Sequence, residues 1–236
     1  YALLGPNGAG KTTTLRMAVG LTEPDSGGVE IYGIDAIKQP IKAKAITTWL
    51  PDEPMLYDRL TPLEYLEFVA GLWGVEAKTA SVRSEELLRM LGLWDERGRR
   101  CEGFSRGMKQ KTALAGALIH DPKLLILDEP LTGLDAGAAR QVKDLLTART
   151  RAGATVILTT HILEEAERCD RIGILNRGEL VALDTPAALK ARIGGDILSI
   201  ETPCPEDLAR GIREKLGGEP TVVNGSVRLE RPQGHR

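Results

Sequence analysis

The sequence predicts an α/β protein whose core is a parallel sheet with helices on both faces. In the second half of the chain, short apolar runs alternate with stretches of helical periodicity, and these runs are "KLLILDEP", "ATVILTTH" and "RIGILNRG". Such alternation is typical of βαβ units, in which helices join parallel strands. The first run is apolar at nearly every position, which indicates a strand that is covered on both faces.

The N-terminal part begins with a strand that leads into a glycine-rich loop. "YALLG" is a short apolar run that ends at a glycine, as a buried strand does before a loop. A helix is expected over residues 11–21 and a short strand in "GGVEIYG", between glycine turns. A further strand is expected in "ITTWLP", where Pro51 ends it.

A helical segment is expected within this core, over about residues 58–113. In "TPLEYLEFVAGLWG", Thr61 is a cap, Pro62 is the first helical residue and Glu64 completes a capping box. "SVRSEELLRMLGL" is expected to form a second amphipathic helix, and residues 105–119 a third. We therefore predict a helical subdomain inserted in the α/β core.

The C-terminal part contains two more core helices and then changes its pattern. The helices are expected over residues 136–149 and in a segment that ends at Glu167. Past residue 194 we expect a strand in "GDILSIET", a helix over 206–216 and a hairpin in "PTVVNGSVRLE" with its Asn-Gly turn at 224–225. The predicted domains are a main domain over residues 1–194 and a small α+β appendage over residues 195–236.

Composition limits the function. The 236 residues carry a formal net charge of -2 and a pI of about 6.0, which gives no electrostatic case for a nucleic-acid partner. The three cysteines show no metal-binding spacing, so we expect reduced packing residues in a cytosolic protein. No apolar run reaches the ~18 residues of a membrane span, so a membrane role would need a partner.

A phosphate-binding loop is the first motif that carries chemistry. "GPNGAGKT" at residues 5–12 fits G-x-x-x-x-G-K-[ST]. Glycines let successive backbone N–H groups point into one hollow, and the following helix adds the positive end of its dipole. Lys11 is expected to bridge the β- and γ-phosphates of a nucleotide, and the Thr12 hydroxyl to ligate Mg²⁺. The predicted phosphate-binding residues are Gly5, Pro6, Asn7, Gly8, Ala9, Gly10, Lys11, Thr12 and Thr13.

A pair of acidic residues supplies the second half of a nucleotide hydrolase. In "LLILDEP", Asp128 ends a buried strand, where it can hold Mg²⁺ directly or through water. Glu129 follows, so one carboxylate can serve the metal and the other can orient water for attack on the γ-phosphate. Many phosphate-loop families share these two motifs, so the motifs alone predict nucleotide hydrolysis and no narrower activity.

The segment between the motifs resembles one family in particular. "FSRGMKQKTALAGALIHDPKLLILDEPLTGLD" is similar to the signature-to-Walker-B segment of the ABC (ATP-binding cassette) ATPases. "SRGMKQ" stands at the family's signature, "TGLD" is the loop after Walker B, and "TTH" at 159–161 occupies the place of the switch histidine. With the phosphate loop, five ordered motifs cover residues 5–161. The resemblance implies a P-loop NTPase fold of the RecA-like type with a helical signature subdomain.

The resemblance also implies a mechanism. Two such domains would face each other head to tail and enclose two ATP molecules, each held by one subunit's phosphate loop and the other's signature. ATP binding would close this dimer and hydrolysis would open it. The implied residues are Lys11, Glu129 and His161 for catalysis, Ser105, Arg106, Gly107 and Met108 for the signature in trans, and Asp135 for the link between the two sites.

The sequence departs from the family pattern at two places. The loop after "ITTWLP" usually carries a glutamine that contacts Mg²⁺ and the coupling interface; here Asp52 or Glu53 fills that place, and we take Asp52 as the metal ligand. In the signature, Arg106 and Met108 replace a glycine and a glutamine. Both changes are similar to the exporter branch that pairs with separate permeases of the ABC-2 type. The tail "ALKARIGGDILSIET" also resembles the appendage of drug-resistance ATPases in that branch.

We therefore expect an ATP-hydrolysing subunit of an ABC-2 type exporter, with ATP and Mg²⁺ as cofactors. It would work as a homodimer or with another nucleotide-binding domain, in the cytoplasm, held at the inner face of the membrane by an integral permease. The alternative is an ABC mechanoenzyme without a membrane partner, which usually has two cassettes or a long coiled coil. A third class, a non-ABC kinase or GTPase, is disfavoured because the chain lacks a guanine-reading N-K-x-D.

The start of the chain is also unusual for this family. ABC cassettes place two strands and an adenine-stacking aromatic residue before the phosphate loop, whereas "YALL" alone precedes Gly5 here. We expect the chain to be an N-terminally truncated piece of a longer ATPase. The alternative is a naturally short variant that holds adenine by another surface.

Overall fold

The computed structural model describes the chain in two compact units. It describes residues 1–236 except 54–55, 193–195, 203, 217–219, 224–225 and 232–236. The first unit is Tyr1–Leu183 and the second is Asp184–Arg236. The division thus falls before residue 194, and the helix α8 (Pro186–Arg192) belongs to the second unit.

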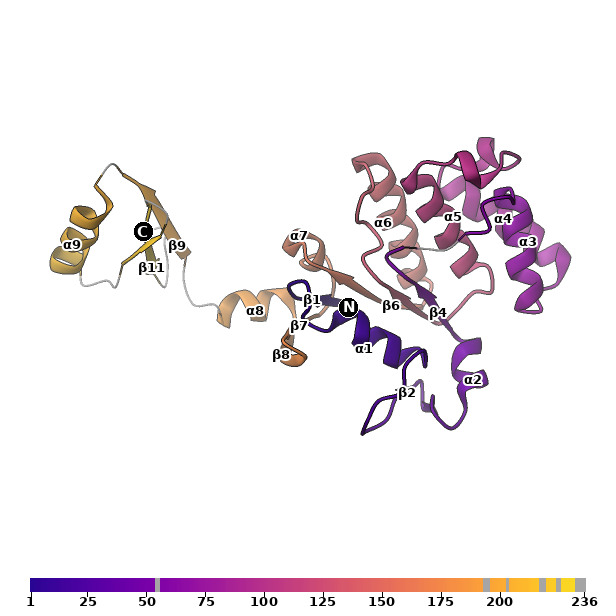
Figure 1. Cartoon of the computed structure of the whole chain (residues 1–236), viewed down its shortest axis with the longest axis horizontal. Helices are drawn as coiled ribbons and strands as arrows, with labels where there is room; N and C mark the ends of the chain where they lie inside the picture. The colour runs from indigo at the N-terminus through magenta and orange to yellow at the C-terminus, as the bar shows by residue number, and fades with distance from the viewer. Residues whose placement is uncertain (54–55, 193–195, 203, 217–219, 224–225, 232–236) are drawn as a thin grey trace. The chain divides into compact units, whose positions relative to one another are not determined.

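A six-stranded sheet forms the centre of the first unit, in the order β4-β5-β6-β1-β7-β8 (Figure 1). Parallel pairing joins β4 to β5, β5 to β6, β6 to β1 and β1 to β7, so the predicted α/β fold with a mainly parallel sheet is confirmed. The strands are β1 (Ala2–Leu4), β4 (Thr47–Leu50), β5 (Leu124–Leu127), β6 (Thr155–Thr160), β7 (Ile172–Asn176) and β8 (Glu179–Asp184).

Helices cover both faces of this sheet. All four residues of β5 are buried, as its continuous apolar sequence predicts. Leu124 and Ile126 pack in one cluster with Leu15 of α1 (Lys11–Ala18), so α1 covers one face. The alternation of side chains along a strand sends Leu125 and Leu127 to the other face, where α5 (Arg106–Leu118) contacts β4 and α6 (Ala136–Arg151) contacts β6.

The inserted segment contains the helices α3 (Pro62–Leu72) and α4 (Ala77–Met90) in addition to α5. The capping box of α3 forms as its sequence indicates: the backbone N–H of Glu64 donates to Thr61 Oγ1 at 3.3 Å, and Glu64 Oε2 accepts from the N–H of Thr61 at 2.8 Å. Short 3₁₀ helices at Trp94–Glu96 and Cys101–Gly103 lead from α4 to α5.

The strand predicted in "GGVEIYG" is β2 (Glu30–Ile31), which pairs with β3 (Ile34–Asp35) in a small hairpin. The sequence did not predict β3, the helix α2 (Pro40–Ala45) that follows the hairpin, or the edge strand β8. The helix α1 also ends at Ala18, earlier than the predicted residue 21, and α7 is a single turn at Leu163–Ala166.

The turn between β7 and β8 supports the phosphate loop. Arg177 and Gly178 both have positive φ, 50° and 83°, as a two-residue hairpin turn requires. The N–H of Gly178 donates to the carbonyl oxygen of Ala9 at 2.9 Å. The hairpin of β7 and β8, which the sequence did not predict, therefore contacts the loop of residues 5–12 through this hydrogen bond.

The second unit contains α8 and a small α+β arrangement. An antiparallel sheet in the order β10-β11-β9 packs against α9, where Ala209 and Ile212 contact Val227 and Leu229. The predicted turn at residues 224–225 lies outside the described residues. The elements are β9 (Asp196–Glu201), α9 (Pro205–Leu216), β10 (Thr221–Val223) and β11 (Ser226–Arg231).

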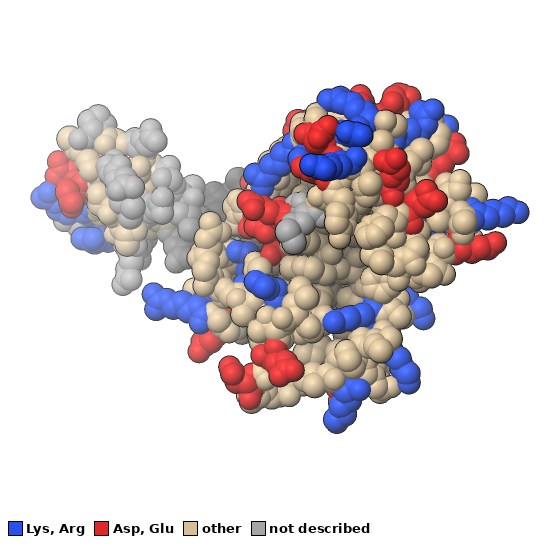
Figure 2. Space-filling model, turned by 45° about the vertical axis from the view of Figure 1, so that its right-hand side comes forward, with Lys and Arg blue, Asp and Glu red and all other residues tan. Residues whose placement is uncertain are grey.

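The surface carries charges of both signs. Lys and Arg are interspersed with Asp and Glu across the face that Figure 2 shows, in line with the small net charge. Among the helices that the structure describes, none is both long enough and apolar enough to cross a membrane. The three cysteines are free thiols, and burial raises the pKa of Cys101 to about 11.

Candidate functional site

The loop of residues 5–12 lies between the end of β1 and the start of α1, as the motif predicts. Its glycines are required by geometry. Gly8 and Gly10 have φ of 78° and 98°, in the left-handed region that side chains disfavour. A Cβ at Gly5 would lie 2.4 Å from the carbonyl oxygen of Leu175 on β7. The loop can therefore turn tightly and approach the neighbouring strand closely.

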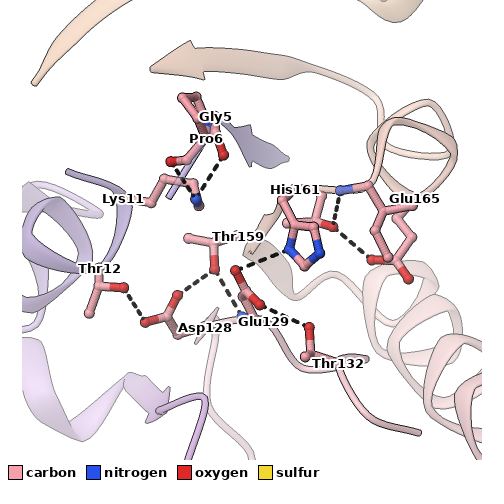
Figure 3. Close-up of polar contacts among 12 residues, drawn as sticks. Gly5, Pro6, Lys11, Thr12, Asp128, Glu129, Thr132, Thr159, His161 and Glu165 are labelled. Atoms are coloured by element: carbon pink, nitrogen blue, oxygen red, sulfur yellow. Dashed lines mark hydrogen bonds and ion pairs between the residues drawn. The ribbon is translucent and has the colours of Figure 1, made fainter. Parts of the chain in front are cut away.

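Lys11 occupies the inside of this loop (Figure 3). The residue is 6% exposed, and its Nζ donates to the carbonyl oxygens of Gly5 at 2.8 Å and Pro6 at 3.1 Å. A buried ammonium group needs such acceptors, because burial without them is costly. The oxygen atoms of a phosphate bound in this loop could replace the two carbonyl oxygens as hydrogen-bond acceptors for Nζ of Lys11.

The carboxylate of Asp128 connects the loop to the central strands. Asp128 follows β5, is 1% exposed, and its N–H donates to the carbonyl oxygen of Leu50 at 2.8 Å. Its Oδ2 accepts a hydrogen bond from the Thr12 hydroxyl at 2.7 Å. Its Oδ1 accepts a hydrogen bond from the Thr159 hydroxyl of β6. Both oxygen atoms are thus paired with hydroxyl groups.

These residues fit a magnesium ion. Within the described residues, no cation forms a salt bridge with Asp128, so a buried carboxylate lies beside a hydroxyl without a countercharge. Hard oxygen ligands of this kind suit Mg²⁺, which often takes one or two protein ligands and completes its shell with water and substrate phosphates. The described part of the chain contains no group of three or more His, Cys, Asp or Glu side chains that could hold a metal ion.

Asp52, the predicted third metal ligand, lies at the same end of the sheet. Asp52 and Glu53 border one cavity together with Thr12 and Asp128. The Oδ1 of Asp52 accepts a hydrogen bond from the N–H of Glu53 at 2.9 Å, which forms a local turn after Pro51. The structure brings Asp52 to the rim of the site, and its role as a ligand stays a prediction.

Glu129 is held at three points. Its Oε2 accepts from the Thr132 hydroxyl at 2.9 Å, and its Oε1 lies 3.3 Å from Nδ1 of His161 (Figure 3). Its backbone N–H donates to Thr159 Oγ1 at 2.9 Å. The residue has φ of 45°, a disfavoured backbone conformation that the surrounding bonds maintain. The carboxylate therefore points to the end of β6 that carries His161.

The turn that carries His161 has its own polar support. The Thr160 hydroxyl donates to Glu165 Oε2 at 2.8 Å and accepts from the N–H of Ile162 at 3.0 Å. Lys143 of α6 lies 4.0 Å from the other carboxylate oxygen of Glu165. Sequence reasoning missed this support and the hydroxyls of Thr132 and Thr159, since threonine is common and only the fold brings these hydroxyls to the site.

The signature residues begin α5, away from the loop of residues 5–12. Ser105 caps this 13-residue helix, and its Oγ accepts from the N–H of Met108 at 3.3 Å. The side chain of Arg106 lies against Gly133, and Gly107 approaches Leu134. Ser105 and Arg106 are exposed. Within the described residues, no hydrogen bond or ion pair joins the signature of this chain to its own phosphate loop.

Asp135 caps α6 directly after the "TGLD" loop. Its Oδ1 accepts from the N–H of Ala138 at 2.9 Å, and this hydrogen bond lowers the pKa of the exposed carboxyl. The role predicted for Asp135 at an interface between two domains stays a prediction. The position is consistent with it, because the cap is exposed and follows Glu129 by six positions in the chain.

A cavity of about 790 Å³ lies between the sheet and the helical segment. Its wall combines the polar residues of the site with apolar side chains of β4, α3 and α5. It therefore connects the carboxylate of Asp128 to a largely apolar surface. The residues that line the cavity include Thr12, Asp52, Glu53, Trp49, Tyr65, Val69, Trp73 and Asp128.

The sequence matches a described family and several known proteins. A profile of the family "ABC transporter" matches residues 1–132. The linearmycin resistance ATP-binding protein LnrL of Bacillus subtilis is 40% identical over 199 residues, which are 84% of this chain and 64% of LnrL. The daunorubicin/doxorubicin resistance ATP-binding protein DrrA of Streptomyces peucetius is 37% identical over an alignment that spans 100% of this chain and 74% of DrrA.

A solved structure has a similar fold. The ATP-binding cassette MJ0796, described as a dimer in a post-hydrolysis state bound to ADP and Pi, superimposes with a TM-score of 0.70 at 26% identity. The match covers 78% of this chain and 84% of that one. The chain thus spans most of a solved cassette and part of the length of the resistance proteins that it resembles.

Proposed function

Because the chain belongs to the ABC transporter family, we propose that it is the ATP-binding and ATP-hydrolysing subunit of an ABC-2 type exporter. The observation that carries this proposal is the continuous polar network from Thr12 through Asp128 and Thr159 to Glu129 and His161. It joins a phosphate loop, a metal-binding carboxylate and a candidate base in one place. LnrL and DrrA are named for resistance to linearmycin and to daunorubicin/doxorubicin, and export of a compound is one route to resistance, which supports the choice of an exporter.

Binding of ATP would use the phosphate loop and α1. Lys11 would exchange the carbonyl oxygens of Gly5 and Pro6 for oxygen atoms of the β- and γ-phosphates. The N-terminus of α1 adds backbone N–H groups to the same hollow. Thr12 and Asp128 would hold Mg²⁺, with Asp52 at the rim, and the ion when bound neutralises charge on the phosphates.

Hydrolysis would use Glu129 and His161. Glu129 would orient and deprotonate the attacking water, for which an ionised carboxylate is suited. Its contacts with Thr132 and His161 hold the carboxylate in a defined direction. His161 is 46% exposed, so the imidazole can reach a γ-phosphate and the carboxylate from the same turn.

A complete site would require a second copy of the domain. Ser105 and Arg106 at the start of α5 are exposed, and among the described residues no hydrogen bond or ion pair joins them to the phosphate loop of their own chain. Backbone N–H groups at a helix start attract an anion. We therefore place the γ-phosphate between one subunit's Lys11 and the other's Ser105 and Gly107, with Asp135 near the contact. The dimer named for MJ0796 supports this arrangement.

The permease would dock in the cavity beside the metal site. Trp49, Tyr65, Val69 and Trp73 offer an apolar surface, while Thr12 and Asp128 border the same cavity. A permease segment packed against this surface would contact the helical subdomain and the metal-binding residues together. Closure of the ATP-driven dimer would then be passed to the membrane subunit, which would set the substrate.

Co-expression with a permease encoded beside this gene tests the proposal. We expect the two proteins to co-purify in detergent and the permease to change the ATPase rate. Val69→Arg, in the cavity, should abolish co-purification but leave the basal ATPase rate intact. Val82→Arg is the matched control, because Val82 is 63% exposed on α4 and does not border the cavity. Equal co-purification of both variants would contradict this docking place.

A further inference from the structure

One buried hydroxyl contacts both acidic residues of the site. Thr159 is 0% exposed, donates to Asp128 Oδ1 and accepts from the backbone N–H of Glu129 at 2.9 Å (Figure 3). We propose that Thr159 is a positioning residue for ATP hydrolysis, which sets the direction of the Asp128 carboxylate and the backbone of Glu129. This inference rests on the proposed function, and it assigns to Thr159 a role that the motifs themselves do not give it.

The sheet register explains why Thr159 reaches both residues. Leu127, the last residue of β5, pairs with Leu158 of β6. Thr159 is therefore the first residue of β6 past the end of β5, where Asp128 and Glu129 follow. On its other side it pairs with Leu3 of β1, which leads into the phosphate loop. Thr159 thus lies on a central strand of the sheet, between β5 and β1.

The two contacts require a hydroxyl. An ionised carboxylate can only accept hydrogen bonds, and a backbone N–H can only donate one. The group between them must donate to Asp128 and accept from Glu129 with one atom. Serine and threonine do this at that size. Valine has the shape of threonine without the hydroxyl, and would leave both polar partners unsatisfied in a buried place.

Each contact has a separate consequence. The bond to Oδ1 leaves Oδ2 of Asp128 facing Thr12, so Thr159 determines which carboxylate oxygen is presented to the metal. The bond to the N–H of Glu129 holds a residue with φ of 45°, and so keeps its carboxylate between Thr132 and His161. Thr159 itself has no described contact with the phosphate loop side chains, and it acts through its two neighbours.

Three variants of the full chain test the role of Thr159. Thr159→Val should lower kcat by roughly 10- to 100-fold, the usual effect of losing a residue that orients a metal ligand. The KM for ATP should rise by a smaller factor than kcat falls, because Lys11 and the loop are untouched. Thr159→Ser keeps the hydroxyl and should restore most of the rate. Thr155→Val is the control, since Thr155 lies on β6 with its hydroxyl 2.8 Å from that of Tyr32.

A second measurement does not depend on turnover. Electron paramagnetic resonance of free Mn²⁺ reports how tightly each variant binds the ion with the analogue AMP-PNP. We expect weaker Mn²⁺ binding in Thr159→Val and ordinary binding in Thr159→Ser and Thr155→Val. If Thr159→Val does not fold, Thr159→Ala takes its place in both assays, with the same expected outcome.

Two results would overturn the inference. One is a Thr159→Val protein with ordinary kcat and Mn²⁺ affinity. The other is a Thr159→Ser protein as impaired as Thr159→Val, which would show that the methyl group and not the hydroxyl matters. Absence of ATP hydrolysis by the unmodified chain would instead contradict the proposed function, and the Mn²⁺ measurement would still decide the role of Thr159.

Discussion

The hydroxyl of Thr12 donates a 2.7 Å hydrogen bond to Oδ2 of Asp128, although 116 positions separate the two residues. The bond joins the start of α1 to the end of β5. It brings the two oxygen groups that we assign to Mg²⁺ into direct contact. A metal–nucleotide complex would therefore bind where these two groups meet.

Loss of the Lys11 charge should weaken nucleotide binding. Lys11→Ala removes the ammonium group that lies inside the phosphate loop. The carbonyl oxygens of Gly5 and Pro6 then lose the hydrogen bonds that Nζ donates to them. In the unmodified chain, ATP at ~100 times its dissociation constant should stabilise the fold by ~2.7 kcal/mol. A thermal-shift titration should show most of this stabilisation lost in Lys11→Ala and retained in the control Lys42→Ala, whose lysine lies exposed on α2. Equal shifts in both would contradict the role of Lys11.

Mixed dimers should reveal that the signature acts in trans. Ser105→Arg should block the anion site at the start of α5, so this variant and Lys11→Ala should each be inactive alone. In a mixed head-to-tail dimer, one of the two sites has an intact phosphate loop from one chain and an intact signature from the other. Mixing the two variants should therefore restore part of the ATPase rate. No recovery, with both variants folded, would indicate that the signature serves its own chain.

His120 should make the fold sensitive to mild acid. Its ring stacks on Trp73 at 4.1 Å between centroids, and burial lowers its pKa below the ordinary value of 6.5. Below pH 6.5 the imidazole of His120 takes up a proton more readily in the unfolded chain than in the folded one. The free energy of unfolding therefore has its full value above pH 6.5 and falls as the pH drops below it. Asp121 nearby opposes this shift and Arg83 reinforces it.

The variant His120→Phe keeps an aromatic ring at this position and removes the titration. Urea unfolding at about pH 7.5 and pH 5.5 gives the loss of stability on acidification for each protein. We expect the unmodified chain to lose more than His120→Phe over this interval. The same loss in both would mean that His120 does not titrate in this range, and that carboxylates account for the acid sensitivity.

The helices and strands were predictable where the apolar pattern and the length of a segment both indicate the same kind of element. The run at Leu124–Leu127 is buried at every position, and the capping signals of Thr61 and Glu64 form the contacts that they predict. The helix α2 was missed because six residues with one buried side chain carry little periodicity. The strand β8 was missed because an edge strand with exposed apolar residues, such as Leu180 and Val181, lacks the pattern of a buried one.

The candidate site was predictable only in part, for a similar reason. Lys11, Asp128 and Glu129 belong to motifs with fixed spacing, and the fold places Asp128 and Glu129 on one network. Thr132 and Thr159 lie in the quoted "TGLD" and "TTH" segments, but those patterns give their hydroxyls no partner. Thr159 reaches Asp128 only through the β5–β6 register, and Thr132 reaches Glu129 through a turn that depends on the positive φ of Glu129. Such contacts follow from tertiary structure and not from local pattern.

ATP hydrolysis by the unmodified chain and by Glu129→Gln is the most direct test of the central claim, that Glu129 is the base for water attack. The amide keeps the size of the side chain and an acceptor for Thr132, but it cannot take up a proton. We predict that Glu129→Gln binds ATP as tightly as the unmodified chain, hydrolyses it ~10²- to 10⁴-fold more slowly, and accumulates as a dimer with Mg-ATP on gel filtration. A Glu129→Gln protein that hydrolyses ATP at the unmodified rate would contradict the claim.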